Sequence, residues 1–137
     1  MRKMGMRAHG FLDFFIGLLL IISPAVWRLP PQAPEALTPI GVGIALLGYS
    51  LLTDYQFGVF RIISMPAHLL LDLATGIVLA LSPWMFGFST ETWLLHLLGG
   101  VILIVISLLT NPRPVYHLIK YRKRKLHKPL YRTYSIR

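Results

Sequence analysis

The chain has 137 residues, of which 55% are hydrophobic and 14% are charged, whereas a typical soluble domain has roughly 25% charged residues. This deficit argues against a soluble globular domain and favours a protein embedded in a bilayer. The net charge of +9 lies mainly at the two ends, because residues 8–110 contain only Arg28 and Arg61 among the lysines and arginines. A nucleic-acid-binding domain would instead spread its basic side chains over a folded face.

The N-terminal segment, MRKMGMR followed by an apolar run, has the general form of a signal peptide. No small-x-small cleavage pattern follows it, and further apolar segments do, so we expect residues 1–7 to remain as a basic cytoplasmic N-terminus. The chain contains no cysteine, which excludes a disulfide framework, a thiolate nucleophile and a zinc–thiolate site.

Four apolar segments have about the length of a membrane-spanning helix, which is roughly 17–25 residues. We expect these helices at residues 8–27, 38–55, 66–86 and 92–110. The first connection, RLPPQAP, is too rich in proline for a helix. Residues 56–65 are expected to form a short cytoplasmic loop, and Ser89 or Thr90 is expected to cap the fourth helix.

The sequence is similar to itself at a shift of 59 positions. The identical pairs are Ala8/Ala67, His9/His68, Asp13/Asp72, Gly17/Gly76, Leu20/Leu79, Ser23/Ser82 and Pro24/Pro83. At a shift of 57, Gly43 aligns with Gly100, and the SLLT sequence at 50–53 aligns with that at 107–110. We therefore predict an all-α membrane protein with four transmembrane helices, built as two tandem helical hairpins, residues 8–55 and 66–110. A pseudo-two-fold axis along the membrane normal should relate the two hairpins.

The lysine and arginine residues predict the orientation in the membrane. Three of them precede the first helix and nine lie in residues 111–137, whereas only Arg28 lies on the opposite side. Since cytoplasmic segments carry an excess of these residues, both termini are expected in the cytoplasm.

Both odd-numbered helices end in a Ser-Pro sequence followed by tryptophan. The residues are Ser23, Pro24 and Trp27 in the first copy and Ser82, Pro83 and Trp84 in the second. Proline kinks or stops a helix, a serine hydroxyl can satisfy the carbonyl that proline frees, and tryptophan favours the headgroup level. We interpret each ending as a helix stop with an interfacial anchor, and a ligand-binding role is the alternative.

Several motifs resemble the SPW repeat family of small prokaryotic integral membrane proteins. These are HGFLDF at 9–14, SLLTDY at 50–55, MPAHLLLDLATG at 65–76 and LSPWMFGF at 81–88. The resemblance covers residues 8–110 and implies two-helix repeats in the cytoplasmic membrane of a prokaryote, with no settled function that can be carried over. The first copy departs from the pattern, because Ser-Pro-Ala-Val-Trp displaces its tryptophan by two residues.

The most unusual residues are His9, Asp13, His68 and Asp72, because ionisable groups within membrane spans are costly and usually face the bundle interior. Histidine and aspartate at i and i+4 share one helix face. If the odd-numbered helices face each other, the four groups converge. They could fix helix register as polar glue, hold a divalent metal or a haem iron, or relay protons or ions.

Small residues predict where helices approach closely. Gly17 and Gly76 continue the His/Asp stripes, and Gly43 and Gly100 occupy equivalent positions on the even-numbered helices. Gly41 and Ala45 are expected to pack in the same way.

Residues 111–137 are expected to form a basic cytoplasmic tail, with a basic amphipathic helix at about 114–129 lying on the anionic leaflet. The lipid-facing cations would be Lys120, Arg122, Lys123, Arg124, Lys125 and Lys128. Interleaved tyrosines leave RNA or an acidic protein as alternative partners, of which nucleic acid is disfavoured.

We expect a non-enzymatic membrane protein that packs with itself or with a larger membrane complex. An enzyme is disfavoured because the sequence shows no nucleophile with a base in a loop context and no phosphate-binding loop, so no catalytic residue is assigned. No cofactor is predicted. A metal, a haem or proton conduction at the His/Asp cluster is the alternative.

Overall fold

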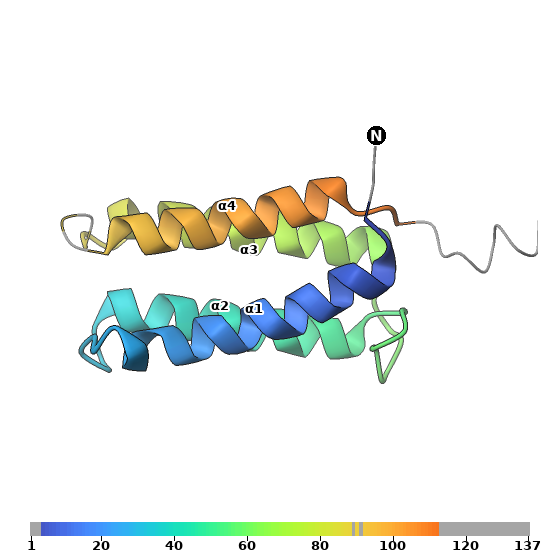
Figure 1. Cartoon of the computed structure of the whole chain (residues 1–137), viewed down its shortest axis with the longest axis horizontal. Coiled ribbons are helices and arrows are strands. Elements are labelled where there is room, and N and C mark those ends of the chain that lie inside the picture. The colour runs from blue at the N-terminus through green and yellow to red at the C-terminus, as the bar shows by residue number, and fades with distance from the viewer. Residues whose placement is uncertain (1–3, 89, 91, 113–137) are drawn as a thin grey trace, which may run out of the picture.

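The computed structural model describes residues 4–88, 90 and 92–112, and this part of the chain consists of four helices and their connections. The helices are α1 (Met6–Val26), α2 (Pro34–Leu52), α3 (Met65–Met85) and α4 (Trp93–Leu109). They run side by side along the long axis of the molecule (Figure 1). The predicted all-α class is confirmed, and α1, α2 and α3 are long and apolar enough to cross a membrane. Helix α4 is also apolar, and its 17 residues lie at the lower end of the range for a span.

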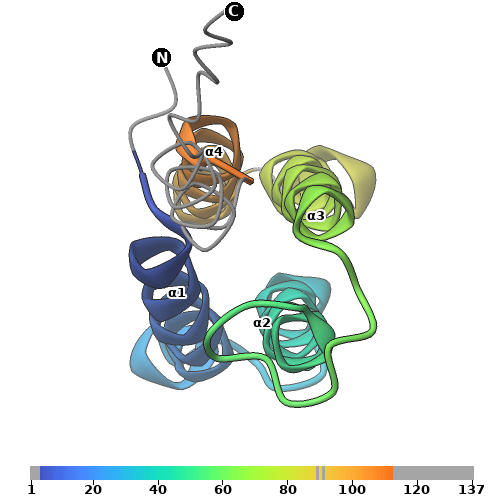
Figure 2. The ribbon, with the colours of Figure 1, turned by 90° about the vertical axis from the view of Figure 1, so that its right-hand side faces the viewer.

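The helices occupy the four corners of a bundle, with α1 diagonally opposite α3 and α2 diagonally opposite α4 (Figure 2). Helix α1 packs closely against α2, and α3 packs closely against α4, whereas the contact between α2 and α3 is smaller. The molecule is therefore two tight hairpins joined across a central axis. Side chains that point inward from α1 and α3 can meet only at this axis.

Glycine allows the close approach within each hairpin. A Cβ atom on Gly43 would lie 2.6 Å from the carbonyl oxygen of Gly17, and one on Gly76 would lie 2.9 Å from the carbonyl oxygen of Gly100. The helix backbones touch at these points. The expectation for Gly41 and Ala45 is wrong, because both are exposed and a Cβ on Gly41 would meet nothing within 4 Å.

The helix boundaries differ from the expected ones where prolines and turns are involved. Helix α2 begins at Pro34, four residues early, because proline is tolerated in the first helical turn. It ends at Leu52, and the chain turns at Thr53. Helix α4 begins at Trp93 with Thr92 at its N-cap position, and no side-chain capping bond is made there. A cap from Thr90 is therefore wrong, and Ser89 lies outside the described residues.

The two Ser-Pro sequences lie inside the last turns of α1 and α3, which continue to Val26 and Met85. Because proline has no N–H, it leaves the carbonyl four residues earlier without its helical donor. The Ser23 hydroxyl donates to the Leu20 carbonyl at 2.9 Å, and the Ser82 hydroxyl donates to the Leu79 carbonyl at 2.7 Å. Each serine thus satisfies the carbonyl that the following proline frees, so the helix ends shortly after the proline without a buried unpaired group.

A third internal proline, Pro39, frees the carbonyl of Glu35 in α2. Nε2 of His96 in α4 lies 3.1 Å from that oxygen, and Nδ1 lies 3.0 Å from the carbonyl oxygen of Thr92. His96 is 4% exposed. It therefore ties α4 to α2 at the end of the bundle opposite the His/Asp cluster, and this hydrogen-bonded role is the one expected for a lone buried histidine.

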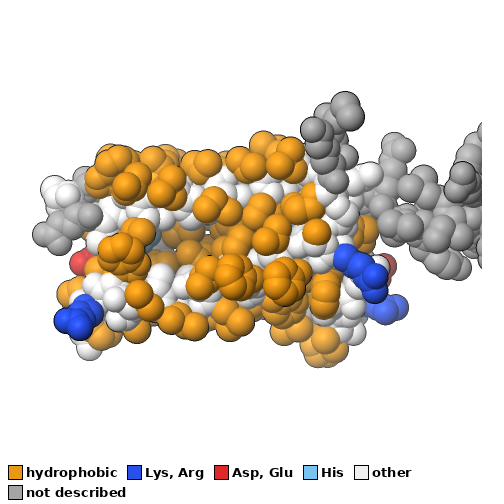
Figure 3. All heavy atoms as spheres, in the orientation of Figure 1, with side chains coloured by type: hydrophobic (Ala, Val, Ile, Leu, Met, Phe, Trp, Pro, Cys, Tyr) orange, Lys and Arg blue, Asp and Glu red, His pale blue; other side chains and the backbone are white. Residues whose placement is uncertain are grey.

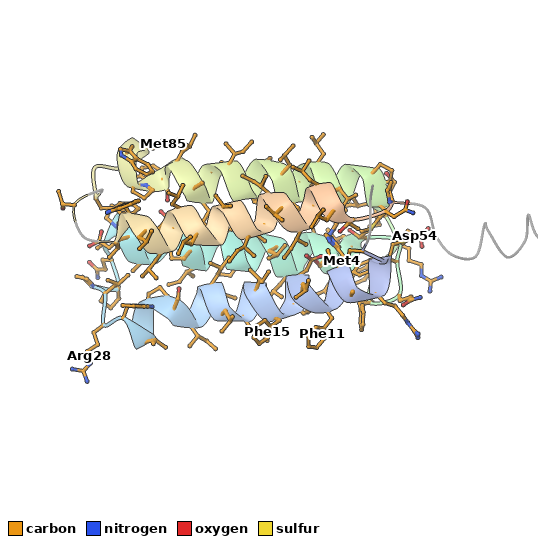
Figure 4. The ribbon with its side chains drawn as sticks, turned by 45° about the horizontal axis from the view of Figure 1, so that its top comes forward. Met4, Phe11, Phe15, Arg28, Asp54 and Met85 are labelled. Atoms are coloured by element: carbon orange, nitrogen blue, oxygen red, sulfur yellow. The ribbon has the colours of Figure 1, made fainter. Side chains whose placement is uncertain are left out.

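The outer surface is suited to lipid. Hydrophobic side chains cover the face in Figure 3 along its whole length, and Lys and Arg side chains appear on this face only near its two ends. Phe11 and Phe15 point away from the bundle, while Arg28 and Asp54 lie at opposite ends (Figure 4). Trp27 and Trp84 are 57% and 54% exposed. An apolar flank between polar ends is what a bilayer requires.

The N-terminal segment returns to the end of α4. The Met4 N–H donates to the Leu109 carbonyl at 3.2 Å, and the Asn111 N–H donates to the Met4 carbonyl at 3.0 Å. Met4 forms an isolated parallel β-bridge with Thr110, and Ile63, in the connection between α2 and α3, forms the same kind of bridge with Thr53. These two pairings involve positions related by the sequence shifts of 59 and 57.

Candidate metal centre

The four residues of the predicted polar cluster meet on the bundle axis. His9 and Asp13 come from the first turns of α1, and His68 and Asp72 come from the first turns of α3. All four side chains are at most 1% exposed. The diagonal helices do not have to touch, because their inward side chains span the axis between them.

Four atoms of these residues form a compact group. Nε2 of His9 lies 3.0 Å from Nε2 of His68 and 3.1 Å from the Oδ2 atom of each aspartate. Nε2 of His68 lies 3.0 Å from Oδ2 of Asp13 and 3.4 Å from Oδ2 of Asp72. One ligand atom from each residue lies within 4.8 Å of all the others. Side chains from two hairpins therefore present two imidazole nitrogens and two carboxylate oxygens to one point.

Two threonines fix which nitrogen of each imidazole carries the proton. The Thr53 hydroxyl lies 2.6 Å from the Tyr49 carbonyl oxygen and 2.8 Å from Nδ1 of His68. Two oxygens at 2.6 Å need a proton between them, and only the hydroxyl has one to give. Thr53 thus donates to the carbonyl and accepts from His68, so Nδ1 of His68 is the protonated nitrogen.

The same arrangement holds for the other histidine. The Thr110 hydroxyl lies 2.6 Å from the Ile106 carbonyl oxygen and 2.9 Å from Nδ1 of His9. A neutral imidazole with its proton on Nδ1 has a lone pair on Nε2. Both Nε2 lone pairs therefore point at the centre of the cluster, where they meet the two carboxylates. A histidine that donates its outer N–H to a fixed acceptor is the usual arrangement around a metal ion.

The four facing atoms concentrate negative charge in a buried site. With neutral imidazoles and ionised carboxylates, the cluster has two negative charges and no hydrogen between its four facing atoms. Burying such charges without compensation is strongly unfavourable. One further proton between the two Nε2 atoms, which are 3.0 Å apart, would offset only one of these charges, and protons on both would set two positively charged N–H groups against each other. A single divalent cation at the centre would neutralise both charges and use all four lone pairs.

The residues around the cluster were only partly predictable. Thr53 and Thr110 end the two SLLT sequences, which the sequence analysis treated as repeat identities without chemistry. Tyr49, which donates to Oδ1 of Asp72 at 2.8 Å, precedes the first SLLT and has no tyrosine counterpart in the second repeat. The signal in the sequence that could have identified these threonines was their repetition at the end of both SLLT sequences.

A loop covers the cluster at the end of the bundle near Met4. The Tyr55 side chain is 5% exposed, and its ring lies 5.8 Å from that of His68. A Cβ on Gly10 would collide with the Tyr55 ring, so only glycine at this position leaves room for the tyrosine side chain. Burial raises the pKa of Tyr55 to about 12, so its hydroxyl keeps its proton at neutral pH.

The helix-stop residues lie away from the cluster. Ser23 and Trp27 line an apolar groove of about 300 Å³ that also includes Leu79, His96 and Gly99. This groove lies toward the Ser-Pro end of the bundle, and none of the four cluster residues lines it. The Trp84 ring packs on Trp93, with ring centroids 6.3 Å apart.

The fold and the site define a multi-pass helical membrane protein with a buried His/Asp cluster. A family model described as the SPW repeat domain matches residues 7–110. The chain belongs to the SPW repeat family, and the resemblance seen in its motifs is confirmed. No curated protein and no solved structure matches the chain.

Proposed function

We propose that this SPW repeat protein binds one divalent metal ion between its two hairpins, with His9, Asp13, His68 and Asp72 as ligands. The observation that carries the proposal is the convergence of four lone pairs on one point, with both Nδ1 protons directed outward to threonines. The four residues still act as polar glue between the hairpins, but the cation is what allows them to meet.

The distances support this proposal. Five of the six separations among the four atoms are 3.0–3.4 Å, and the sixth, between the two carboxylate oxygens, is within 4.8 Å. Neighbouring ligand atoms about 3.1 Å apart are compatible with the 2.0–2.2 Å at which zinc binds histidine and carboxylate ligands. Each hairpin supplies one histidine and one aspartate, so an ion at the centre joins the two hairpins.

A bis-histidine haem, one of the alternatives from the sequence, does not fit. Two axial nitrogens on opposite sides of a haem iron are about 4 Å apart with a flat macrocycle between them. The two Nε2 atoms are 3.0 Å apart, and carboxylates occupy the space around them.

The test is elemental analysis of detergent-purified wild type beside the double variant His9→Ala/His68→Ala. We expect close to one equivalent of a divalent transition metal in the wild type and almost none in the variant. His96→Ala is the matched control, because it removes a third buried histidine outside the cluster and should retain the metal. A wild type that is metal-free and takes up neither Zn²⁺, Co²⁺ nor Mn²⁺ would contradict the proposal.

The sequence also supports proposals about the location, orientation and repeat structure of the protein. We propose that the protein lies in the cytoplasmic membrane of a prokaryote with both termini in the cytoplasm. The hydrogen bonds of Met4 with Leu109 and Asn111 support a common side for the termini, because they place both ends of the helical region together. The duplicated hairpin is supported by the paired contacts of Thr53 with His68 and Thr110 with His9. The basic tail lies outside the described residues, and the absence of a catalytic role, the lipid contacts and the self-association stay predictions.

A further inference from the structure

The two halves of the metal centre differ at one position. Tyr49 in α2 aligns with Ile106 in α4 at the shift of 57. The Tyr49 hydroxyl lies 2.8 Å from Oδ1 of Asp72, the carboxylate oxygen that faces away from the centre. The corresponding oxygen of Asp13 is buried and has no hydrogen-bond partner among the described residues. The tyrosine hydroxyl that holds Oδ1 of Asp72 therefore has no equivalent at Oδ1 of Asp13, whose other oxygen accepts a 3.5 Å hydrogen bond from the Ser50 hydroxyl.

The direction of this hydrogen bond is fixed by its neighbours. Tyr49 also lies 3.1 Å from the hydroxyl of Thr75, which is 2.9 Å from the Leu71 carbonyl. Thr75 can donate to that carbonyl and needs no proton from Tyr49. An ionised carboxylate only accepts, so the phenol proton of Tyr49 points to Asp72. A charge-assisted bond of this length holds the carboxylate firmly in one orientation.

We propose, on the basis of the metal function above, that Tyr49 limits the coordination number and thereby favours an ion of the Zn²⁺ type, which accepts four or five ligands. With Oδ1 held by Tyr49, Asp72 can offer only Oδ2 to the ion. Asp13 has no donor at Oδ1 and accepts only a 3.5 Å hydrogen bond from the Ser50 hydroxyl at Oδ2, so it can offer both oxygens. The site therefore reaches at most five protein ligands, which suits Zn²⁺ and Co²⁺ and disfavours ions such as Mn²⁺ that prefer octahedral oxygen-rich sites.

Because Tyr49 and Ile106 are equivalent positions in the two repeats, two variants can be compared with the wild type. Tyr49→Phe removes the hydroxyl and frees Asp72, so both carboxylates can bind through two oxygens. Ile106→Tyr places a hydroxyl at the position equivalent to Tyr49, where it can hold Oδ1 of Asp13. The preference for Zn²⁺ over Mn²⁺ should rise from Tyr49→Phe through the wild type to Ile106→Tyr.

The experiment is a competition between Zn²⁺ and Mn²⁺ for the purified full-length protein, with the visible spectrum of the Co²⁺-loaded form as a second readout. We expect Tyr49→Phe to lower the ratio of Zn²⁺ to Mn²⁺ affinity by about 10-fold, the lower end of the effect of outer-shell partners on metal sites. Its Co²⁺ bands should weaken, because ligand-field bands lose intensity when a four-coordinate ion gains ligands.

Tyr55→Phe is the matched control. Its ring also packs against His68, at 5.8 Å compared with 5.1 Å for Tyr49, but its hydroxyl has no hydrogen-bond partner among the described residues. Tyr55→Phe should leave the affinity ratio and the Co²⁺ spectrum unchanged. The inference is overturned if Tyr49→Phe retains both wild-type values, or if Tyr55→Phe changes them equally. If Ile106→Tyr does not fold, the comparison of Tyr49→Phe with Tyr55→Phe still tests whether the Tyr49 hydroxyl sets the metal preference. A wild type that binds neither ion overturns the proposed function itself, which separates the two failures.

Discussion

At the scale of single residues, the chemistry of the centre depends on protons that are held outside it. Thr53 and Thr110 each pass their only proton to a backbone carbonyl and so require a proton from a histidine. The histidines consequently keep their Nε2 lone pairs for the centre. A hydroxyl and a carbonyl one helical turn apart thus decide the protonation of a side chain on another helix.

Replacing both threonines with valine should weaken the metal centre while preserving side-chain volume. Without the acceptors, Nδ1 of each histidine loses its fixed proton, and we expect metal affinity to fall by about 10–100-fold. Competition with a chromophoric chelator would measure the loss. Thr38→Val is the control, because Thr38 makes the same bond to the Pro34 carbonyl on an exposed face. Equal affinities in the double variant and the wild type would show that the threonines do not orient the ligands.

At the scale of helices, glycine decides how closely each hairpin packs. Gly43 lies against the carbonyl oxygen of Gly17, and Gly100 lies against that of Gly76. Because lipid gives helices no hydrophobic reason to associate, close backbone packing supplies much of the attraction. The same contacts fix the rotation of α1 and α3 that turns their His/Asp faces to the axis.

Gly43→Ala should destabilise the first hairpin, whereas Gly41→Ala should not. The new methyl group at 43 would lie 2.6 Å from a backbone oxygen that cannot move without shifting α1, and we expect a loss of about 1–3 kcal/mol in the free energy of unfolding. A methyl group at 41 meets nothing within 4 Å. It should be neutral or stabilise by up to about 1 kcal/mol through helix propensity. Thermal unfolding in detergent compares the two, and similar midpoints for both variants would contradict the packing argument.

At the scale of the whole molecule, the His/Asp cluster is a buried polar connection between the hairpins. The contact between α2 and α3 is small compared with the contacts inside each hairpin. An ion bound by two ligands from α1 and two from α3 would link them directly. Stability of the bundle should therefore depend on metal.

Removing the metal should lower the unfolding temperature of the wild type. A ligand that binds only the folded state at 100 times its Kd stabilises it by about 2.7 kcal/mol, so chelation should remove stabilisation of this order and added Zn²⁺ should restore it. The double variant His9→Ala/His68→Ala should unfold at a temperature that neither treatment changes. A chelator that lowers both unfolding temperatures equally would point to an effect unrelated to the cluster.

The sequence by itself determined the class of protein, the family and the residues of the cluster. The low content of charged residues and the lengths of the apolar segments predicted four helices. In the structure, each helix begins and ends within four residues of its expected position. His9, Asp13, His68 and Asp72 stood out because ionisable residues are rare in an apolar segment and recurred at one spacing. These signals are local, so composition and periodicity are enough to show them.

The tertiary structure shows how the residues of the cluster are brought together. Only the arrangement of α1 and α3 across the bundle axis brings the two imidazoles within 3.0 Å of each other. The donation of the histidine Nδ1 protons to Thr53 and Thr110, the hydrogen bond from Tyr49 to Asp72, and the exposed position of Gly41 also depend on helix rotation. Hydrophobic patterns fix rotation poorly in a membrane protein, because lipid-facing and buried positions are equally apolar. The chemistry of the centre therefore becomes visible only when the helices are packed.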